Sequence, residues 1–422
     1  MKILIISTQF PYPKDNGKKV ILSSIYEYFI EKHGENSIEY IVVGDNDLKK
    51  SLNSNVIYID KPKVLNQLKN VFFNTLIFRN KSLQESFLFS NDIKKTLVNY
   101  IDEKDIDLVI YDTLRISQYF EDEALDVEEF VYMDDLFSIR YEKMLHNMKK
   151  FKDVDFNVLG NFSSHLPKFA KRISSIQSIS KLLLKYEKGL LKKRELVTAE
   201  KITNKLLISE LEVGVLKANS KQENIRSIRP KVLNHKNNIT KRDYKGVPTF
   251  IFLGSLNIPH NNVSIVNFIK VNMKNLISEN PNVKLKIIGK NPSNEVLKLT
   301  AEYPKNIELS GYVENLDKLF NESCAMIIPL LFGSGVKLKT LEAMSRALPV
   351  ITTNFGAEGI NLPMKGECIV ENDISKFPVH MSNLTNISTN RKMSNLAHRF
   401  FYEYYSKEAV YRQYDNIFSM YH

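Results

Sequence analysis

Short apolar runs alternate with longer helical patterns along most of the chain. Each run is apolar at consecutive positions, as in strands that helices cover on both faces of a parallel sheet. The runs form two series, at 3–7, 38–43, 108–111, 130–133 and 206–209, and then at 250–253, 285–288, 307–309, 325–328 and 350–352. The pattern predicts an α/β fold with two doubly wound, Rossmann-like domains.

The length of the chain also favours two domains, because 422 residues exceed the roughly 250–300 at which single cores usually split. The stretch 219–248 is rich in Lys, Asn and Arg and poor in apolar clusters, which is typical of a linker. We therefore predict a first domain at 1–220, a linker at 221–248 and a second domain at 249–395. The aromatic, helical tail 396–422 is expected to pack back on the first domain.

Cysteine content and hydropathy indicate the compartment. Cys324 and Cys368 are the only cysteines and form no CxxC pair, so neither disulfides nor structural zinc is expected. The run 3–6 is too short for a signal-peptide core, and no run approaches the roughly 18–20 apolar residues of a membrane span. We expect a cytoplasmic protein, with any membrane contact peripheral and at the inner face.

The net charge of +11 points to an anionic partner. Nine Lys or Arg residues lie between Lys168 and Arg194 against one acid, and apolar residues recur there at helical spacing. One interpretation is a solvated helix face, and the other is a helix 168–194 on an anionic membrane, beside a lipid-linked acceptor. Nucleic acid is not expected as a partner, because the basic residues are not interleaved with aromatics on a known module.

Glycines concentrate in the second half, where nine of the 15 lie between Gly246 and Gly366. Gly254, Gly289 and Gly333 each follow an apolar run. Ligands of open α/β sheets bind outside the carboxyl ends of the strands, where glycine lets the backbone approach a phosphate. The second domain is therefore predicted to bind a nucleotide.

The segment 333–344, GSGVKLKTLEAM, contains the densest group of candidate ligand-binding residues. A glycine turn leads into a helix whose free N–H groups and dipole favour phosphate, and Lys337 and Lys339 add positive charge. Glu342 would face a neutral hydroxyl such as that of a ribose. The alternative is a glycine-opened helix with two solvated lysines.

Several segments together resemble a known family. They read FLGSLNIPHNN at 252–262, KLKIIGKNPS at 284–293, IELSGYVENLDKLF at 307–320 and PLLFGSGVKLKTLEAMSRALPVITTNFGAEG at 329–359. The stretch 250–359 resembles the C-terminal domain of bacterial retaining glycosyltransferases of the GT-B fold, in group 1 (family four). TQFPYPKDNGKKV at 8–20 is similar to the first-strand loop of that family.

The resemblance implies two domains that face each other across a cleft, and a nucleotide-sugar donor. Its motifs assign the residues of the donor site as Gly17, Asn257, Tyr312, Val313, Ser334, Gly335, Val336, Lys337, Lys339 and Glu342. Lys337, Glu342 and Asp112 are the candidate catalytic residues. Lys18, Arg115 and Asp135 are the candidates on the acceptor side.

The chain also departs from the family pattern. Ser334 stands where many relatives carry the first of two glutamates, so the group usually near the donor sugar is absent. A basic pair common after the first strand is replaced by Ser255 and the region 259–261. A subgroup with GSG, basic residues and a Gly-Ser-x-Asn segment shares this pattern, and Asn257 belongs to that segment.

Carboxylates in the first half offer further candidates. Asp45-Asn46-Asp47 has the DxD form of metal-binding glycosyltransferases, although a solvated loop is the stronger interpretation. Asp134 and Asp135 follow a strand and could line the cleft, or Asp135 could cap a helix. Asp112 and Arg115, at the end of another strand, could orient acceptor or donor sugar.

We therefore expect a glycosyltransferase that uses a glycan, lipid-linked or protein-linked acceptor in bacterial surface polysaccharide or glycoconjugate synthesis. Backbone N–H groups and lysines would stabilise the departing phosphate, so no metal or other cofactor is expected. The donor phosphate could take the acceptor proton in a retaining reaction. Alternatives are a sugar-nucleotide epimerase on the same fold and a non-catalytic sugar-nucleotide-binding partner.

Overall fold

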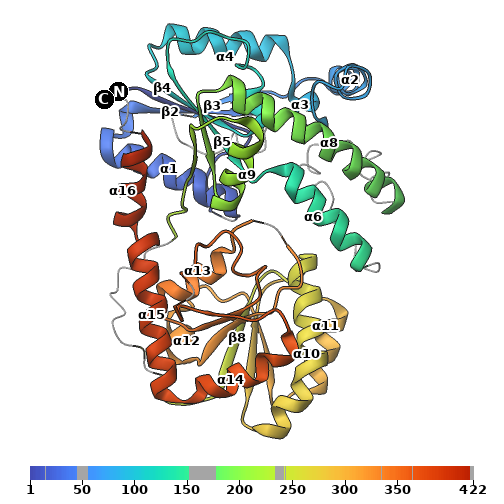
Figure 1. Cartoon of the computed structure of the whole chain (residues 1–422), viewed down its shortest axis with the longest axis vertical. Helices are drawn as coiled ribbons and strands as arrows, with labels where there is room; N and C mark the ends of the chain where they lie inside the picture. The colour runs from blue at the N-terminus through green and yellow to red at the C-terminus, as the bar shows by residue number, and fades with distance from the viewer. Residues whose placement is uncertain are drawn as a thin grey trace. The chain divides into compact units, whose positions relative to one another are not determined.

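The computed structural model describes residues 1–14, 16–44, 56–151, 177–232, 242, 244–333, 335–363 and 365–418. The chain forms two compact units, Met1–Pro230 with Gln413–His422, and Lys231–Arg412. Each unit is a parallel sheet with helices packed around it (Figure 1). The predicted α/β class with two Rossmann-like domains is confirmed.

The sheet of the first unit has the strand order β3-β2-β1-β4-β5-β6-β7. Its strands are β1 (Ile3–Ser7), β2 (Ile38–Val43), β3 (Val56–Ile59), β4 (Leu108–Asp112), β5 (Glu128–Asp134), β6 (Asn204–Leu207) and β7 (Ile225–Ser227). Its helices are α1 (Gly17–His33), η1 (Glu35–Ser37), α2 (Val64–Asn70), the π-helical η2 (Val71–Ile77), α3 (Leu83–Leu88), α4 (Asn91–Glu103), α5 (Leu114–Ser117), α6 (Phe137–Lys150), α8 (Gln177–Lys201) and α9 (Glu210–Ser220).

Burial explains which strands the pattern predicted. Every residue of β1 is buried, and Ile5 pairs with Tyr40 of β2 and Ile110 of β4. All five predicted runs of this half overlap strands, although β6 ends at Leu207, inside the predicted run 206–209. The pattern missed β3, whose residues are half-buried or exposed at the edge, and β7, which has three residues and lies in the predicted linker.

The sheet of the second unit has the order β10-β9-β8-β11-β12-β13. Its strands are β8 (Thr249–Leu253), β9 (Lys284–Ile288), β10 (Ile307–Gly311), β11 (Ala325–Ile328), β12 (Val350–Thr352) and β13 (Ile369–Val370). Its helices are α10 (Pro259–Glu279), α11 (Asn294–Glu302), α12 (Asp317–Glu322), α13 (Leu338–Ser345), η4 (Ile374–Lys376), α14 (Phe377–Thr385) and α15 (Ile387–Tyr405), followed by α16 (Lys407–Phe418). None of the described helices has the length and apolar character needed to cross a membrane.

The C-terminal tail packs in both units, first in the second unit and then in the first. The sequence predicted that it would pack on the first domain alone. Phe400 and Phe401 of α15 are buried in the core of the second unit. Phe418 of α16 belongs to the first unit, where its ring lies 4.9 Å from the rings of Phe29 and Phe130.

Both strand orders reverse direction beside the first strand of their sheet. In the first unit the chain builds outward from β1 through β2 and β3, and then returns to β4 on the other side of β1. In the second unit the same reversal places β11 beside β8. The loops that leave these strand pairs diverge, which opens space at the carboxyl edge, the usual ligand position in this kind of sheet.

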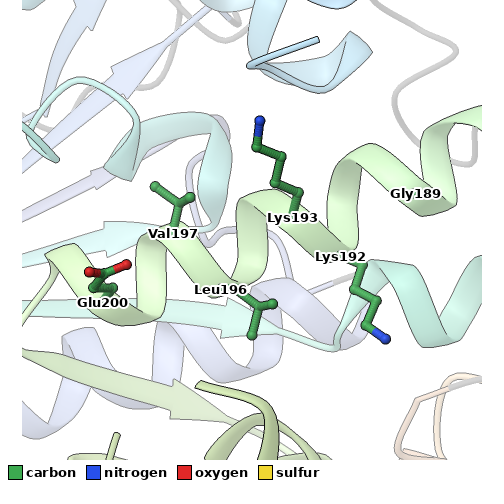
Figure 2. Close-up of a pocket in the computed structure, with 6 residues that line it drawn as sticks. All are labelled: Gly189, Lys192, Lys193, Leu196, Val197 and Glu200. Carbon is green, nitrogen blue, oxygen red and sulfur yellow. The ribbon is translucent and has the colours of Figure 1, made fainter. Parts of the chain in front are cut away.

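Helix α8 differs from the amphipathic helix expected at 168–194. Ile173 and Ile176 of the expected stripe lie outside the described residues, and Ile179 is exposed. The buried face carries Leu190 of the expected stripe, and also charged side chains, Glu187 and Arg194 among them. Lysines are among the exposed residues: Figure 2 shows Lys192 and Lys193 projecting from opposite sides of the helix. Both line a shallow hollow of about 380 Å³.

A buried ion network ties α8 to the rest of the first unit. The guanidinium of Arg194 donates to Glu85 at 2.8 Å and to Glu121 at 2.6 Å. Thr198, one turn later, donates to Glu121 at 2.6 Å. Arg194 and Glu85 are almost inaccessible, so water cannot replace a lost partner.

We expect Arg194→Met to lower the free energy of unfolding by about 3–5 kcal/mol, because it leaves two carboxylates with an uncompensated buried charge. Urea unfolding followed by circular dichroism measures this loss. Lys193→Met, on the exposed face of the same helix, is the matched control and should change stability by less than about 0.5 kcal/mol. Equal losses in the two variants would contradict a structural role for the network.

Candidate functional site

The loops after β8 and β9 approach each other closely. A Cβ placed on Gly289 would lie 2.0 Å from the carbonyl oxygen of Gly254, so only glycine fits there. A Cβ on Gly254 would lie 2.8 Å from the Asn261 side chain and from Nζ of Lys339. The glycines predicted at strand ends therefore bring bare backbone beside a lysine.

Lys337 and Lys339 lie together at the start of α13. Nζ of Lys339 donates to Asn261 Oδ1 at 2.8 Å and lies 5.3 Å from the centre of the Phe252 ring. Burial lowers the pKa of Lys339 to about 7, and the charge of Lys337 acts in the same direction. Burial and the two lysines also lower the pKa of His260, to about 3. The two lysines and His260 therefore share a buried, basic region of the second unit.

The N-terminus of α13 adds to this positive potential. Its N-cap residue is Lys337, and the N-cap makes no side-chain capping hydrogen bond. Instead, Nζ of Lys337 donates to the carbonyl of Gly335 at 2.6 Å, and it lies 3.9 Å from Glu358. Uncapped backbone N–H groups and the dipole of a helix favour an anion at that position.

Glu342 has a charged partner on its own helix. Its Oε1 lies 3.2 Å from a guanidinium nitrogen of Arg346, on the same helix. Arg346 also donates from Nε to Asp317 at 2.8 Å and is buried, whereas the Glu342 side chain is about one-third exposed. Arg346 therefore orients Glu342 on the surface of α13, and Glu342 keeps accessible area for a further partner.

The remaining predicted donor residues line the strand ends of the same unit. Tyr312 follows β10 and is exposed, and Nζ of Lys290 lies 4.2 Å from the centre of its ring. Val313 is half-buried against the core, and Asn257 is exposed and accepts from Ser255 at 2.7 Å. Gly335 has φ of 76°, a conformation that favours glycine. Val336 contacts Gly359, and Ser334 lies outside the described residues.

In the first unit, Asp112 and Lys18 form a buried ion pair at the carboxyl ends of β1 and β4. Their charged atoms are 2.7 Å apart, and Asp112 also accepts from the Ser7 hydroxyl at 2.6 Å. Burial lowers the pKa of Lys18 to about 8, and repulsion from Arg115 acts in the same direction. Gly17 begins α1, and nothing lies within 4 Å of a Cβ built there.

A second carboxylate group follows β5. Asp135 pairs with Arg140 of α6, and Arg140 lies 3.9 Å from Asp134. Burial and the charge of Asp135 raise the pKa of Asp134 and also raise that of Glu212, to about 8. The N-cap of α6 is Leu136, whose N–H donates to Glu212, so the alternative that Asp135 caps this helix is wrong.

Backbone strain marks the same edge of the first sheet. Thr113 and Asp134, which end or follow β4 and β5, have φ of 66° and 67°. Such values cost non-glycine residues energy and cluster at functional sites. The hydroxyl of Thr113 accepts from Nε of Arg115 at 3.2 Å, which holds this predicted acceptor-side residue beside the strained turn.

Sequence reasoning left out several partners that the structure supplies. Ser7, Asn261, Arg140 and Arg346 each orient a predicted residue through a side-chain bond. Most of these contacts could not be predicted, because the two residues of each pair are far apart along the chain. The i, i+4 spacing of Glu342 and Arg346 is an exception, since it predicts a contact on one helix face. Asp45, Asn46 and Asp47 lie outside the described residues.

Comparison with known proteins identifies the second unit. Residues 247–386 match the family model of "Glycosyl transferases group 1". An uncharacterized 44.6 kDa protein in the cps region of Klebsiella pneumoniae is 32% identical over 168 residues, which are 38% of this chain and 43% of that protein. The match thus spans less than half the length of this curated relative.

Solved structures resemble the whole chain. TarM of S. aureus, solved as a mutant with Fondaparinux, alpha-GlcNAc-glycerol and UDP, has a TM-score of 0.62 at 11% identity, with 99% of this chain and 100% of TarM covered. HepE of Anabaena, solved with UDP, has a TM-score of 0.63 at 10% identity, with both chains covered fully. The chain has the GT-B fold, and in residues 247–386 it carries the domain of the group 1 glycosyltransferases.

Proposed function

We propose that this chain is a glycosyltransferase that moves a sugar from a nucleotide-sugar donor to a glycan, lipid-linked or protein-linked acceptor. The observation that carries the proposal is the pair of lysines at the uncapped start of α13, where β8 and β11 end. The family match and the UDP present in the HepE and TarM structures support a nucleotide donor. The Klebsiella relative supports a role in bacterial surface polysaccharide or glycoconjugate synthesis.

The second unit would hold the donor diphosphate. When the bond between sugar and diphosphate breaks, negative charge accumulates on the leaving phosphate. Lys337, Lys339 and the N–H groups of α13 are fixed before the reaction, so they stabilise that charge without reorganising. Glu342, held by Arg346, would accept a hydrogen bond from the donor ribose, while Tyr312 and Val313 would border the base.

The first unit would bind the acceptor and the transferred sugar. Asp112 is buried, paired with Lys18 and bonded to Ser7, which fixes its carboxylate at the end of β4. Arg115 and Asp135 would offer donors and acceptors to sugar hydroxyls nearby. We further propose that the reaction retains the anomeric configuration, needs no metal, and passes the acceptor proton to the leaving phosphate.

A panel of UDP-, GDP-, ADP-, CMP- and TDP-sugars tests donor binding through the melting temperature. One nucleotide should raise the melting temperature of the wild type, since a ligand at 100 times its Kd stabilises by about 2.7 kcal/mol. Lys337→Ala and Glu342→Ala should lose most of that shift. Lys298→Ala, at an exposed position of α11, is the matched control and should keep it.

The same variants then enter a transfer assay with the nucleotide that binds. Nuclear magnetic resonance of the product reports the anomer, and added EDTA reports any need for a metal. Absence of a shift with every nucleotide would overturn the donor site. Binding without transfer or hydrolysis would favour the non-catalytic partner, and sugar isomerisation without an acceptor would favour an epimerase.

Donor affinity should also depend on pH. Lys339 has a pKa of about 7, so above that pH it is neutral and must take up a proton to pair with a phosphate. The Kd for the nucleotide sugar should therefore rise with pH above about 7, by up to about tenfold per unit for one coupled proton. Isothermal titration calorimetry from about pH 6 to about pH 9 measures this dependence, and buffers of different ionisation enthalpy count the protons.

Lys339→Arg is the matched variant for this experiment. Arginine stays protonated throughout this range, so its Kd should stay flat across the same pH interval. A wild-type Kd that is equally flat would show that Lys339 does not take up a proton when the donor binds. Using the intact nucleotide sugar avoids the titration of a terminal phosphate.

A further inference from the structure

The segment 61–81, which contains α2 and η2, has its polar and apolar faces inverted. Gln67 and Thr75 are buried in the protein, whereas eight of the nine large apolar residues of α2, η2 and the next position are exposed. The exposed apolar residues are Val64, Leu65, Leu68, Phe72, Phe73, Leu76, Ile77 and Phe78. Phe72 is 53% exposed and Phe78 is 61% exposed. A helix that faced only water would show the opposite arrangement.

Specific hydrogen bonds hold the segment in this orientation. The Thr75 hydroxyl lies 2.7 Å from the Ser86 hydroxyl, and the Thr75 carbonyl accepts from Tyr186 of α8 at 2.5 Å. Asn70 donates to the carbonyl of Phe89 at 2.7 Å. The polar side chains thus anchor the segment on the protein, and Figure 1 shows α2 at the outer edge of the first unit, beyond α3.

The exposed apolar residues form a concentrated surface. Eight of the 21 exposed large apolar side chains in the described part of the chain fall within the fifteen positions 64–78. Contiguous apolar surface of this kind marks an interaction site, whereas single exposed residues need no explanation. The backbone is helical from Val64 to Ile77, so an apolar partner meets few unsatisfied polar groups there.

The charge of the segment favours an anionic partner. Between Lys61 and Lys81 there are five Lys or Arg residues and no acid. Lys61, Lys63, Lys69 and Arg79 are exposed beside the apolar residues. Phenylalanines and leucines flanked by lysines are typical of helices that lie in a membrane interface, with the rings in the acyl region and the cations at the headgroups.

Helix α8 extends this surface. Tyr186 contacts η2, and its ring lies 5.9 Å from the Arg79 guanidinium. Leu182, one turn before Tyr186, projects from the same side of α8 and is 71% exposed. Apolar and basic side chains of both helices therefore lie on one side of the first unit.

We propose that the segment 61–81 docks the protein on an anionic lipid bilayer, with its apolar residues inserted at the level of the acyl chains. The sequence offered 168–194 as one candidate for a membrane contact; the proposal assigns this contact chiefly to α2 and η2 instead, and the lysines of α8 beyond Tyr186 are not required for it. The proposal is independent of donor chemistry in the second unit. It would hold the first unit, where the acceptor is proposed to bind, close to lipid-linked substrates.

The chain has no tryptophan, so one introduced tryptophan reports insertion directly. Emission of Phe72→Trp should shift to shorter wavelength when vesicles of phosphatidylcholine with phosphatidylglycerol are added, and brominated lipids should quench it. Leu211→Trp is the matched control, since Leu211 is 77% exposed on α9 of the same unit. Its emission should stay unchanged with the same vesicles.

Vesicle flotation measures the affinity. The triple variant Phe72→Ser, Leu76→Ser and Phe78→Ser should bind anionic vesicles at least about tenfold more weakly than wild type. Leu211→Ser, Val271→Ser and Val379→Ser combined remove the same number of exposed apolar side chains elsewhere and should bind normally. Lys63→Glu with Arg79→Glu should weaken binding, whereas Lys192→Glu with Lys193→Glu should leave it intact.

Several outcomes would overturn the proposal. These are wild-type affinity in the triple variant, equal binding to pure phosphatidylcholine vesicles, or loss of binding only in the α8 variant. A dimer in light scattering that the triple variant abolishes, without vesicle binding, would instead make this surface a contact between two copies. Circular dichroism melts confirm folding of each variant, and the nucleotide-dependent shift in melting temperature should persist in all of them, so failure here is distinct from failure of the donor site.

Discussion

Parallel strand pairing in both sheets is the constraint from which the rest of the structure follows. Parallel strands require crossovers on the faces of the sheet, so every central strand is covered by helices and must be apolar at successive positions. The carboxyl ends of all strands then lie at one edge. Where the strand order reverses, between β1 and β4 and between β8 and β11, the loops diverge, and the polar residues of each unit collect there.

The buried charges at the carboxyl edges of the two sheets are paired differently. In the first unit, Lys18 and Asp112 neutralise each other at 2.7 Å, and Arg140 serves Asp134 and Asp135, so the charges are paired and positioned. In the second unit, Nζ of Lys339 donates to neutral Asn261 and Nζ of Lys337 lies 3.9 Å from Glu358, and burial lowers the pKa of Lys339. An excess of buried positive charge is costly to the folded protein, and an anionic ligand would relieve that cost.

On the outer surface of the first unit, α2 and η2 bury polar side chains and expose apolar ones. Helix α8 buries Arg194 and Glu187 together with leucines, while α2 and η2 bury Gln67 and Thr75 and expose phenylalanine. Helices that cover a sheet normally bury their apolar stripe. In α2 and η2 the hydrogen bonds of Thr75 fix the helices instead, which leaves apolar side chains for a partner.

Sequence alone determined most of the strands and the fold class, because buried strands leave local signals, and its glycine turns predicted which half binds a nucleotide. β1, β2, β11 and β12 occur at the predicted bounds, whereas the half-exposed β3 and the short β13 left no pattern to read. The sequence also placed Lys337 and Lys339 at a helix start and Asp112 at a strand end. Tertiary structure decided which partners orient them, such as Asn261 for Lys339 and Ser7 for Asp112. It also decided which face of α2, η2 and α8 is buried, since that choice depends on hydrogen bonds between residues far apart in the chain, which no local pattern encodes.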